Sequence, residues 1–448
     1  MAYSEPASEA SSDWRDSLSL YRNVLAIVGA LTVLQGATAA LSVMIALSLQ
    51  AAGASNAALG LVAAFYAGGF LTGAIASPQQ ITRIGHIRSF AFFAALAIIA
   101  ALSFTLGVNI IGWSVLQAVI GLSTAALLTA GDSWITDSAP ANSRGAILGF
   151  YHVVAKLGAI AGPFAIVAGA NGLAGFMMVA ALFALTIMPI TATRKAQPEI
   201  TTGTPFGPRK ILKYAPAAAF AALCAGAVNN AVAQLYPIYA QSVMPDAAAG
   251  FAANFNAALL GGAMVGLWPA GMISDRIDRR TVIAGAGVIA AASGLALALL
   301  SHTLPAWAAL VLAFIFGTGA LSYYAVAVAH AADRARPDQA TSMMAGILVI
   351  WGIGSIIGPV IAGVVMSTSL GAPGLFAFAS ASLALLAATM FTRTVNKPAT
   401  SEEEKEPFNA TQTTSLALSA LDPRGEEDAE NAQFDLFLAW MASSEADE

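Results

Sequence analysis

The sequence predicts an all-α polytopic membrane protein made of two related six-helix halves. Of its 448 residues, 58% are hydrophobic and only 10% are charged, and the mean hydropathy is +0.73, whereas about a quarter of the residues of a soluble domain are charged. Several apolar runs exceed the roughly 20 residues that cross a bilayer. A glycine–proline motif in the fifth run returns 196 residues later (359 − 163). A β-barrel would need alternating ten-residue segments, which the sequence lacks.

Twelve apolar runs are long enough to be membrane spans. We predict them at approximately residues 24–49, 57–77, 88–107, 109–131, 145–168, 172–192, 214–242, 250–273, 281–300, 305–329, 341–366 and 373–393. The single cysteine, Cys224, lies inside the seventh run, so an intramolecular disulfide is impossible. The first 23 residues are polar and contain no apolar signal-peptide core, so we expect no cleaved leader.

The placement of lysine and arginine predicts the orientation. Apart from Lys156, every base falls in a tail or in a loop on one side, and the opposite loops at 51–56, 171–172 and 301–305 contain none. The basic positions include Arg15, Arg22, Arg83, Arg88, Arg144, Arg194, Lys195, Arg209, Lys210, Lys213, Arg276, Arg279, Arg280, Arg334 and Arg336. Because basic loops stay in the cytoplasm, we predict cytoplasmic termini in a bacterial-type inner (plasma) membrane.

The same pattern divides the chain into five parts. We predict a cytoplasmic N-terminal tail at 1–23, a first six-helix half at 24–193, a polar cytoplasmic linker at 194–213, a second half at 214–393 and an acidic tail at 394–448. The acidic tail contains SEEEKE and GEEDAE, so we expect it to be mostly disordered. Its piece at 434–441 is apolar enough either to dock on a partner or to form a nascent helix in solvent.

The internal duplication is carried by small residues and acids. Gly158, Gly162 and Pro163 in the fifth span recur as Gly354, Gly358 and Pro359 in the eleventh. At the same offset, Asp137 matches Asp333 and Asn142 matches Asp338. Glycines four residues apart give a face for tight helix packing, and an internal proline can kink the helix. Duplicated halves are typical of transporters that hold a central site at the midplane.

The loop between spans eight and nine carries a second motif, Gly271-Met-Ile-Ser-Asp275-Arg276-Ile-Asp278-Arg279-Arg280. It closely resembles the cytoplasmic loop signature of the major facilitator superfamily, G-x-x-x-D-R-x-G-R-R, with Asp278 where glycine is common. An acid such as Asp275 can cap the positive N-terminus of a neighbouring helix, so the segment suits a breakable latch. The first-half counterpart keeps Arg83 and Arg88 but has Thr82 at the acidic position.

The resemblance covers residues 20 to 395 and implies the fold and mode of action of that superfamily. It implies two pseudo-symmetric six-helix bundles that work as a monomer by rocker-switch alternating access. The motif Gly158-x3-Gly162-Pro163 resembles the superfamily's antiporter signature, which favours efflux. Asp132-Ser-Trp134, followed by Arg144-Gly145, resembles a branch related to the drug:proton antiporters.

Lys156 is the only deeply placed base. It lies about 12 residues beyond Arg144, near the bilayer middle at roughly 1.5 Å per residue. An ionisable residue there should face a cavity or a partner. His152 and Pro163 share its helix face, whereas Gly158 and Gly162 lie on another. Lys156 and His152 could attract an anionic group or carry a proton. Alternatively, Lys156 is neutral, or pairs with a carbonyl group or Asp132.

Polar residues in the spans that this family uses to line its cavity are candidate substrate ligands. They are Gln35 in span one, Gln117 in span four, Asn230 and Gln234 in span seven, and Tyr323 and Tyr324 in span ten. The alternative for each is an ordinary hydrogen bond between helices. Gln117 stands where the family's drug antiporters often carry arginine, and no Asp or Glu lies well inside spans one, four, seven or ten. A carboxylate proton relay is therefore not supported, which leaves coupling through His152 and Lys156, or facilitated diffusion.

Asp132 and Arg144 are the remaining charged candidates. Their positions near the cytoplasmic ends of spans four and five favour a structural or gating pair or, for Asp132, a helix cap, although Asp132 could also be a coupling acid. His330, which ends span ten, is expected at the interface.

These features predict a transporter rather than an enzyme. The sequence has no P-loop for ATP, its histidines are too scattered for a metal site, and its bases flank the membrane instead of forming a nucleic-acid surface. We expect no cofactor. The expected partners are a small organic solute, anionic or amphipathic, and membrane lipid, with the proton as a candidate coupling ion. The alternatives are a facilitative uptake carrier, or a non-transporting sensor or scaffold that acts through its acidic tail.

Overall fold

The computed structural model describes residues 10–138, 144–168, 172–191, 208–334 and 340–396. Twelve spans within these residues are long and apolar enough to cross a membrane. The helices are α1 (Ala10–Ala51), α2 (Asn56–Ile84), α3 (His86–Ser103), η1 (Phe104–Leu106), α4 (Ile110–Ser138), α5 (Arg144–Val167), α6 (Leu173–Thr191), α7 (Pro208–Tyr214), α8 (Pro216–Val243), η3 (Pro245–Ala247), α9 (Ala248–Arg276), α10 (Arg279–Leu299), α11 (Ala306–Ala320), α12 (Tyr323–Ala332), α13 (Ala340–Met366) and α14 (Gly374–Asn396). The predicted all-α membrane fold is confirmed.

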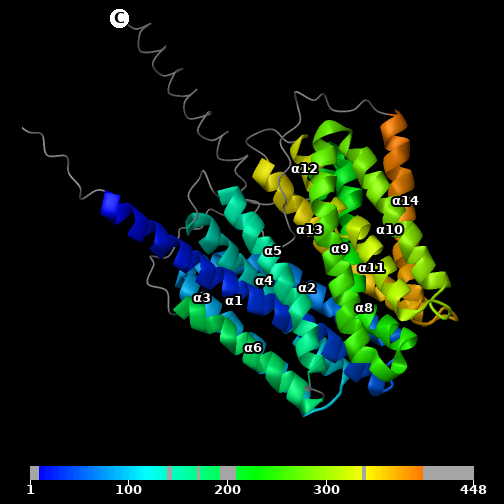
Figure 1. Cartoon of the computed structure of the whole chain (residues 1–448), viewed down its shortest axis with the longest axis horizontal. Coiled ribbons are helices and arrows are strands. Elements are labelled where there is room, and N and C mark those ends of the chain that lie inside the picture. Colours follow the sequence, from blue (N-terminus) through cyan, green and yellow to red (C-terminus); the bar gives the residue numbers. More distant parts are fainter. Residues whose placement is uncertain (1–9, 139–143, 169–171, 192–207, 335–339, 397–448) are drawn as a thin grey trace, which may run out of the picture.

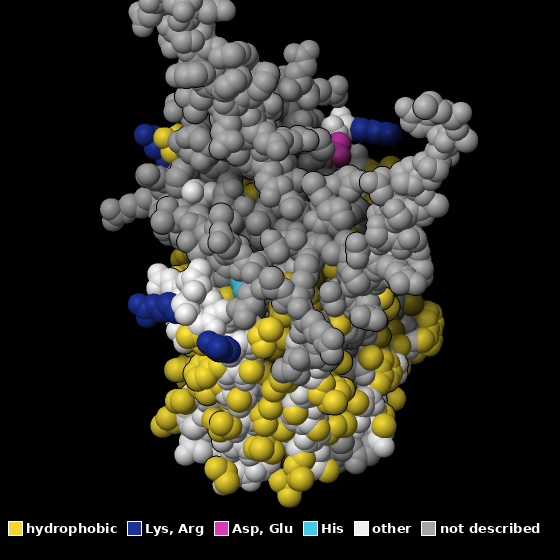
Figure 2. All heavy atoms as spheres, turned by 90° about the vertical axis from the view of Figure 1, so that its left-hand side faces the viewer, with side chains coloured by type: hydrophobic (Ala, Val, Ile, Leu, Met, Phe, Trp, Pro, Cys, Tyr) yellow, Lys and Arg dark blue, Asp and Glu magenta, His cyan; other side chains and the backbone are white. Residues whose placement is uncertain are grey.

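The helices form two groups that meet along the middle of the molecule (Figure 1). Helices α1 to α6 make one group and α8 to α14 the other; the groups converge at the lower end of the view and diverge towards the upper end. On the face shown in Figure 2, the visible lysine and arginine side chains lie in the upper part, above a broad hydrophobic surface. We call this end, where α2, α9 and α14 finish, the basic end; its bases are Arg83, Arg276 and Arg393 in the last turns of those helices, Arg88 at the start of α3 and Lys213 in α7.

Three local features differ from the predicted element pattern. Helix α1 begins at Ala10, within the region predicted as an N-terminal tail. The end of the predicted linker forms the short helix α7, which has a proline at its first position, where the missing N–H costs nothing. The tenth span is one membrane crossing, Ala306–Ala332, but consists of two helices. The predicted acidic tail beyond Asn396 and most of the linker lie outside the described residues.

The break in the tenth span falls at Leu321 and Ser322. The hydroxyl of Ser322 donates to the carbonyls of Thr318 and Gly319 in the preceding turn, a form of back-bonding that often bends helices. Leu321, at the break, and Tyr324, in the first turn of α12, line the central cavity described below. The irregular backbone therefore lies beside the cavity, where membrane proteins tolerate it.

The duplicated glycines pack in the same way in both halves. Methyl groups added to Gly158 and Gly162 of α5 would overlap backbone atoms of Thr32 and Gly36 in α1. Likewise, methyl groups on Gly354 and Gly358 of α13 would overlap the backbone of Leu223 and Ala227 in α8. Each glycine pair therefore allows two helix backbones to touch, which is the small-residue packing typical of membrane helices.

The two halves hold each other at the end opposite the basic end. The Nδ2 of Asn56 in α2 donates to the Met366 carbonyl of α13 over 2.8 Å, and the Ala57 amide donates to Ser367 Oγ over 3.0 Å. Next along α2, Gly60 lies directly against the Pro359 backbone. Asn256 of α9 donates from Nδ2 to the Ala159 carbonyl of α5 over 2.9 Å. These contacts close the interface of the halves at the opposite end.

Candidate functional site

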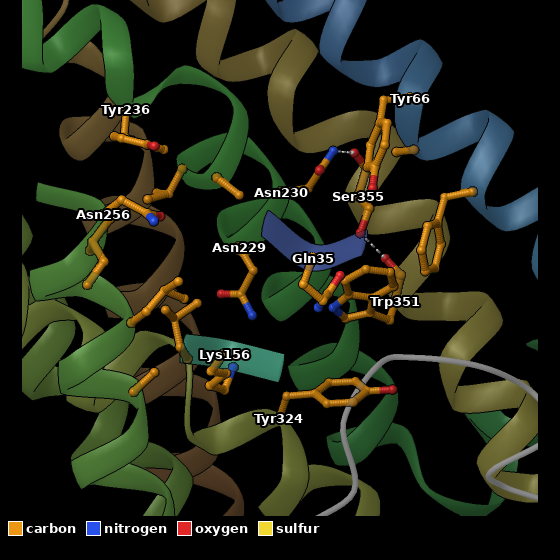
Figure 3. A pocket seen from close by; sticks show the side chains of 18 of the residues that line it. Gln35, Tyr66, Lys156, Asn229, Asn230, Tyr236, Asn256, Tyr324, Trp351 and Ser355 are labelled. Atoms are coloured by element: carbon orange, nitrogen blue, oxygen red, sulfur yellow. Dashed lines mark hydrogen bonds between the residues drawn. The ribbon is translucent and has the colours of Figure 1, made fainter. Parts of the chain in front are cut away.

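A cavity of about 320 Å³ lies at the interface of the two halves. Both halves supply its walls, through α1, α2, α4 and α5 on one side and α8, α9, α12 and α13 on the other. The polar and aromatic side chains that line it are Gln35, Tyr66, Phe70, Thr124, Lys156, Asn229, Asn230, Tyr236, Asn256, Tyr324, Trp351 and Ser355 (Figure 3). Its volume lies at the lower end of the range of small-molecule sites, which are commonly about 300–1,000 Å³.

Lys156 is the one lysine, arginine, aspartate or glutamate among the described residues that line this cavity. It is half-buried on α5, and its side chain reaches the part of the cavity that Gln35 and Asn229 also face (Figure 3). The opposite side of α5 holds Gly158 against α1. Packing of the glycine face thus fixes the rotation of α5 and turns Lys156 towards the cavity.

Several polar atoms of the cavity wall have no hydrogen-bond partner within the described part of the chain. They are Oδ1 of Asn229, the hydroxyl of Tyr236 and the indole Nε1 of Trp351, all buried. A buried polar group without a partner costs free energy, about 1–3 kcal/mol. These groups supply both donors and acceptors, so the cavity is suited to a polar solute that satisfies them.

Two other amides of the cavity are held by the protein itself. Asn230 donates from Nδ2 to the Ser355 carbonyl over 2.8 Å, and Ser355 in turn donates to the Trp351 carbonyl over 3.0 Å (Figure 3). Asn256 makes the bond to Ala159 that joins the halves. Each of these amides keeps its oxygen for another contact, and its position is fixed before a solute arrives.

The sequence-predicted ligands separate into three groups. Gln35, Lys156, Asn230 and Tyr324 line the central cavity. Gln117 and Gln234 meet instead in a void of about 10 Å³, which is about the room of a single water. His152 and Tyr323 are buried, and neither is among the residues that line the cavity. The His152 ring packs on that of Tyr151, with 4.7 Å between ring centroids.

Asp132 is completely buried in α4 and interacts with Tyr151 of α5. The chain therefore places this carboxylate between α4 and α5, away from the solvent-exposed interface. The side chain of Arg144, its predicted structural partner, lies outside the described residues, so that pairing stays a prediction.

The latch segment, residues 271–280, sits at the basic end between α9 and α10. The side chains of Arg279 and Asp333 are each 1% exposed and form an ion pair, with 2.8 Å between Arg279 Nε and Asp333 Oδ2. Asp275 is 42% exposed and lies 3.9 Å from the Arg279 guanidinium. The chain thus joins the start of α10 to the end of α12 by a buried ion pair. Residues 335–339 before α13 are not described, so capping of a neighbouring helix by Asp275 stays a prediction.

Asp278, which replaces the common glycine of the latch signature, has a local role. Its carboxylate accepts from the Arg280 amide over 2.9 Å and caps the N-terminus of α10. It also pairs with the Arg280 guanidinium at 2.6 Å. Burial opposes ionisation of Asp278, but hydrogen bonds from Arg280 and the charge of Arg280 outweigh it and hold the pKa below its ordinary value. The departure from glycine is therefore compensated by a helix cap.

The first half has a histidine at the corresponding position of the latch. His86 follows Gly85, whose φ of 86° suits glycine, and corresponds to Arg279 in the motif. Its Nε2 lies 2.9 Å from Ser133 Oγ of α4, and both side chains are buried. This buried contact joins the start of α3 to α4, as the Arg279–Asp333 pair joins α10 to the end of α12.

Sequence reasoning missed the cavity residues from helices that were not expected to line it. Tyr66, Asn256 and Trp351 come from the second, eighth and eleventh spans. An isolated amide in an apolar span, such as Asn256, was the available signal. Asn229 also lines the cavity, although only its neighbour Asn230 was predicted as a ligand.

The chain belongs to the Major Facilitator Superfamily, whose family model matches residues 25–266 and 246–441. It is 26% identical over 347 residues to the MFS-type transporter YcaD of Escherichia fergusonii, covering 76% of this chain and 88% of the relative. It is also 26% identical over 356 residues to YcaD of Salmonella typhi, covering 78% and 90%. The protein is accordingly an integral membrane transporter of the secondary type, and not an enzyme.

Solved structures share the fold at low sequence identity. A bacterial homologue of the human lysosomal transporter Spinster, in an inward-facing and occupied conformation, has a TM-score of 0.68 at 16% identity, covering 86% of this chain and 97% of the other. A D-xylose–proton symporter has a TM-score of 0.69 at 14% identity, covering 86% and 99%. The predicted superfamily fold is confirmed. The similarity concerns the fold and does not extend to the solutes that these proteins transport.

Proposed function

We propose that the protein exports a small anionic or amphipathic organic solute across a bacterial inner membrane by rocker-switch alternating access. In this proposal the basic end is cytoplasmic, both termini lie there, and the carrier acts as a monomer. The solute binds in the central cavity, with Lys156 as the charged ligand and Gln35, Asn229, Asn230 and Tyr324 around it. The observation that carries the proposal is one ammonium group among unpartnered polar atoms between the two halves.

The composition of the cavity favours an anionic head on a partly apolar body. Lys156 supplies the one positive charge on the described wall, and Asn229 and Trp351 supply hydrogen-bonding atoms. The remaining wall is largely aromatic and aliphatic, including Tyr66, Tyr236 and Trp351. Such a site combines a few fixed polar contacts with apolar burial, the usual composition of a small-molecule site.

The membrane potential supports export as the direction. With the cytoplasm negative, moving one negative charge outward releases about 2.3 kcal/mol per 100 mV. The resemblance of Gly158-x3-Gly162-Pro163 to the antiporter signature supports the same direction. Because Lys156 must keep its charge to hold the anion, the driving force that we propose is the membrane potential acting on the anion itself.

The experiment that tests the solute class is thermal stabilisation of the purified protein by panels of organic anions, cations and neutral solutes. A ligand at 100 times its Kd adds about 2.7 kcal/mol of stability. We expect anions to raise the Tm of the wild type and of Lys156→Arg, and Lys156→Ala to lose the response. Lys213→Ala, which removes a base at the basic end, is the matched control and should respond normally.

Two results would contradict the proposal. If an anion stabilised the wild type and Lys156→Ala equally, Lys156 would not be a ligand of that anion. Stabilisation by cations or neutral solutes alone would overturn the anionic solute class.

A further inference from the structure

A second pocket, separate from the central cavity, lies at the basic end of the second half. It has a volume of about 110 Å³ and is lined by Lys213, Arg280, His330, Arg334 and Arg393, with Tyr214, Pro216 and Ala217. The walls come from α7, the starts of α8 and α10, and the ends of α12 and α14. We call it the basic pocket. Four cationic side chains with no acidic residue on the described wall make it a site for an anion.

The charges of the basic pocket are only partly balanced within the described protein. Arg280 pairs with Asp278 and donates from Nη1 to the Arg393 carbonyl over 2.9 Å. Lys213, Arg334 and Arg393 have no ion pair with a described carboxylate. Arg334 instead lies 2.8 Å from a ring nitrogen of His330. Burial and the nearby charge of Arg280 lower the pKa of Arg334, so its charged form would be stabilised by a bound anion.

The position of the pocket matches the level of lipid phosphates. Lys213 lies three residues before the span that starts at Pro216, Arg334 two residues after the span that ends at Ala332, and Arg393 within the last turn of α14. All three therefore stand at the boundary between the apolar span and water. Basic pockets between helices at this level on the cytoplasmic side are suited to anionic lipid head groups.

An apolar groove along α10 and α14 begins next to the same residues. Its volume is about 820 Å³, and its lining runs from Thr281 to Leu295 on α10 and from Phe391 to Ala377 on α14. Thr281 follows Arg280 directly, and Phe391 precedes Arg393 by two residues. Fourteen residues of helix (295 − 281) extend about 21 Å, a length suited to an acyl chain.

We propose that the basic pocket binds the phosphate of an anionic phospholipid, with an acyl chain of the same lipid in the groove between α10 and α14. The lipid would bridge the linker helix α7, the latch helix α10 and the last helix α14. It would therefore join the latch segment to the surrounding membrane, at a place distinct from the solute cavity.

The test uses the full-length protein purified in detergent and titrated with phosphatidylglycerol, phosphatidylcholine or inorganic phosphate, with the Tm as readout. We expect phosphatidylglycerol alone to raise the Tm. Lys213→Gln/Arg334→Gln should weaken its binding about tenfold or more, since each base near a membrane surface contributes substantially to anionic lipid binding. Arg83→Gln/Arg88→Gln, which removes two exposed bases of the first half, is the matched control and should bind normally.

The groove is tested separately with Gly285→Leu. An added Cβ at Gly285 meets no atom within 4 Å, so the larger side chain should enter the groove without disturbing the fold. Gly149→Leu is the matched control, because Gly149 of α5 is equally open. Gly285→Leu should weaken phosphatidylglycerol binding, and Gly149→Leu should not.

Three outcomes would overturn the proposal. If Lys213→Gln/Arg334→Gln and Arg83→Gln/Arg88→Gln weakened phosphatidylglycerol binding equally, the lipid would be attracted unspecifically to surface charge. An equal Tm rise with inorganic phosphate would make the ligand a free anion. Unchanged binding in both Lys213→Gln/Arg334→Gln and Gly285→Leu would place the lipid elsewhere.

Discussion

At the scale of single residues, Lys156 and Asp278 show how this chain uses charge near or within the membrane. Lys156 lines the central cavity. Its side chain therefore avoids contact with hydrocarbon, which would cost an ammonium group at least about 2.5–3.5 kcal/mol. Asp278 instead stands at the basic end, where it caps α10 and binds Arg280. The charge of Lys156 is therefore available for a ligand, whereas the charge of Asp278 stabilises the start of α10.

Asp278→Asn should lower the Tm at neutral pH, because it removes the charged partner of Arg280 while keeping a side chain that can cap a helix. The pKa of Asp278 is lowered in the fold. Its contribution is therefore present above the unfolded pKa of about 4 and is lost as the pH falls through the folded value. Thermal melts of both proteins across the acid range check this.

The matched control is Asp278→Gly, which restores the residue common in the family and removes both cap and charge. It should be less stable at neutral pH than Asp278→Asn. A Tm difference between wild type and Asp278→Asn that grows as the pH falls would have the wrong sign and would reject the assigned role.

At the scale of elements, the sequence predicts the membrane spans, but it predicts the rotation of each helix about its axis only in part. All twelve spans follow from length and hydropathy, because hydrocarbon demands about 20 apolar residues in a helix. The break at Leu321 and Ser322 was not predicted, since it depends on side-chain hydroxyls bonding within one turn. Helix α7 was missed because a seven-residue amphiphilic helix leaves little pattern.

The candidate site shows the same limit. Lipid-facing and protein-facing sides of these helices are both apolar, so periodicity defines their rotation weakly. Lys156 lines the cavity, on the side of α5 away from the glycine face, whereas His152, predicted on the same face as Lys156, does not. Gln117, Gln234 and Tyr323 lacked such a constraint and lie away from the cavity. Whether the cavity residues bind a solute stays a prediction.

Gly162→Ala tests the packing of α5 on α1. The added methyl would overlap the Gly36 backbone, so the helices must separate at a cost of about 1–3 kcal/mol. We expect a clearly lower Tm, and a similar loss for Gly358→Ala, where Ala227 is the obstacle. Gly149→Ala, which meets no atom within 4 Å, is the control. A wild-type Tm for Gly162→Ala would show that α1 and α5 are not in backbone contact there.

At the scale of the whole molecule, the contacts between the halves decide the state of the carrier. The hydrogen bonds of Asn56, Ala57 and Asn256 lie in the half of the protein opposite the basic end, and the groups of helices diverge towards the basic end (Figure 1). Alternating access requires these hydrogen bonds between the halves to break. A transporter must therefore expose the central cavity to each side in turn, whereas a static scaffold need not.

The most direct measurement of this central claim labels one cavity position from both sides of the membrane. The single cysteine, Cys224, is first replaced by alanine, and Asn229→Cys places a thiol on the cavity wall. A membrane-impermeant thiol reagent is then applied to inside-out and right-side-out vesicles. The same assay is repeated with Ala57→Cys/Ser367→Cys, which can be oxidised to join α2 and α13 where they already touch.

Alternating access predicts labelling from both sides, faster in inside-out vesicles because the contacts at the opposite end are closed. Oxidation of the Ala57→Cys/Ser367→Cys pair should abolish labelling in right-side-out vesicles alone, and reduction should restore it. Labelling from one side only, unchanged by the cross-link, would contradict the account and leave a static membrane protein.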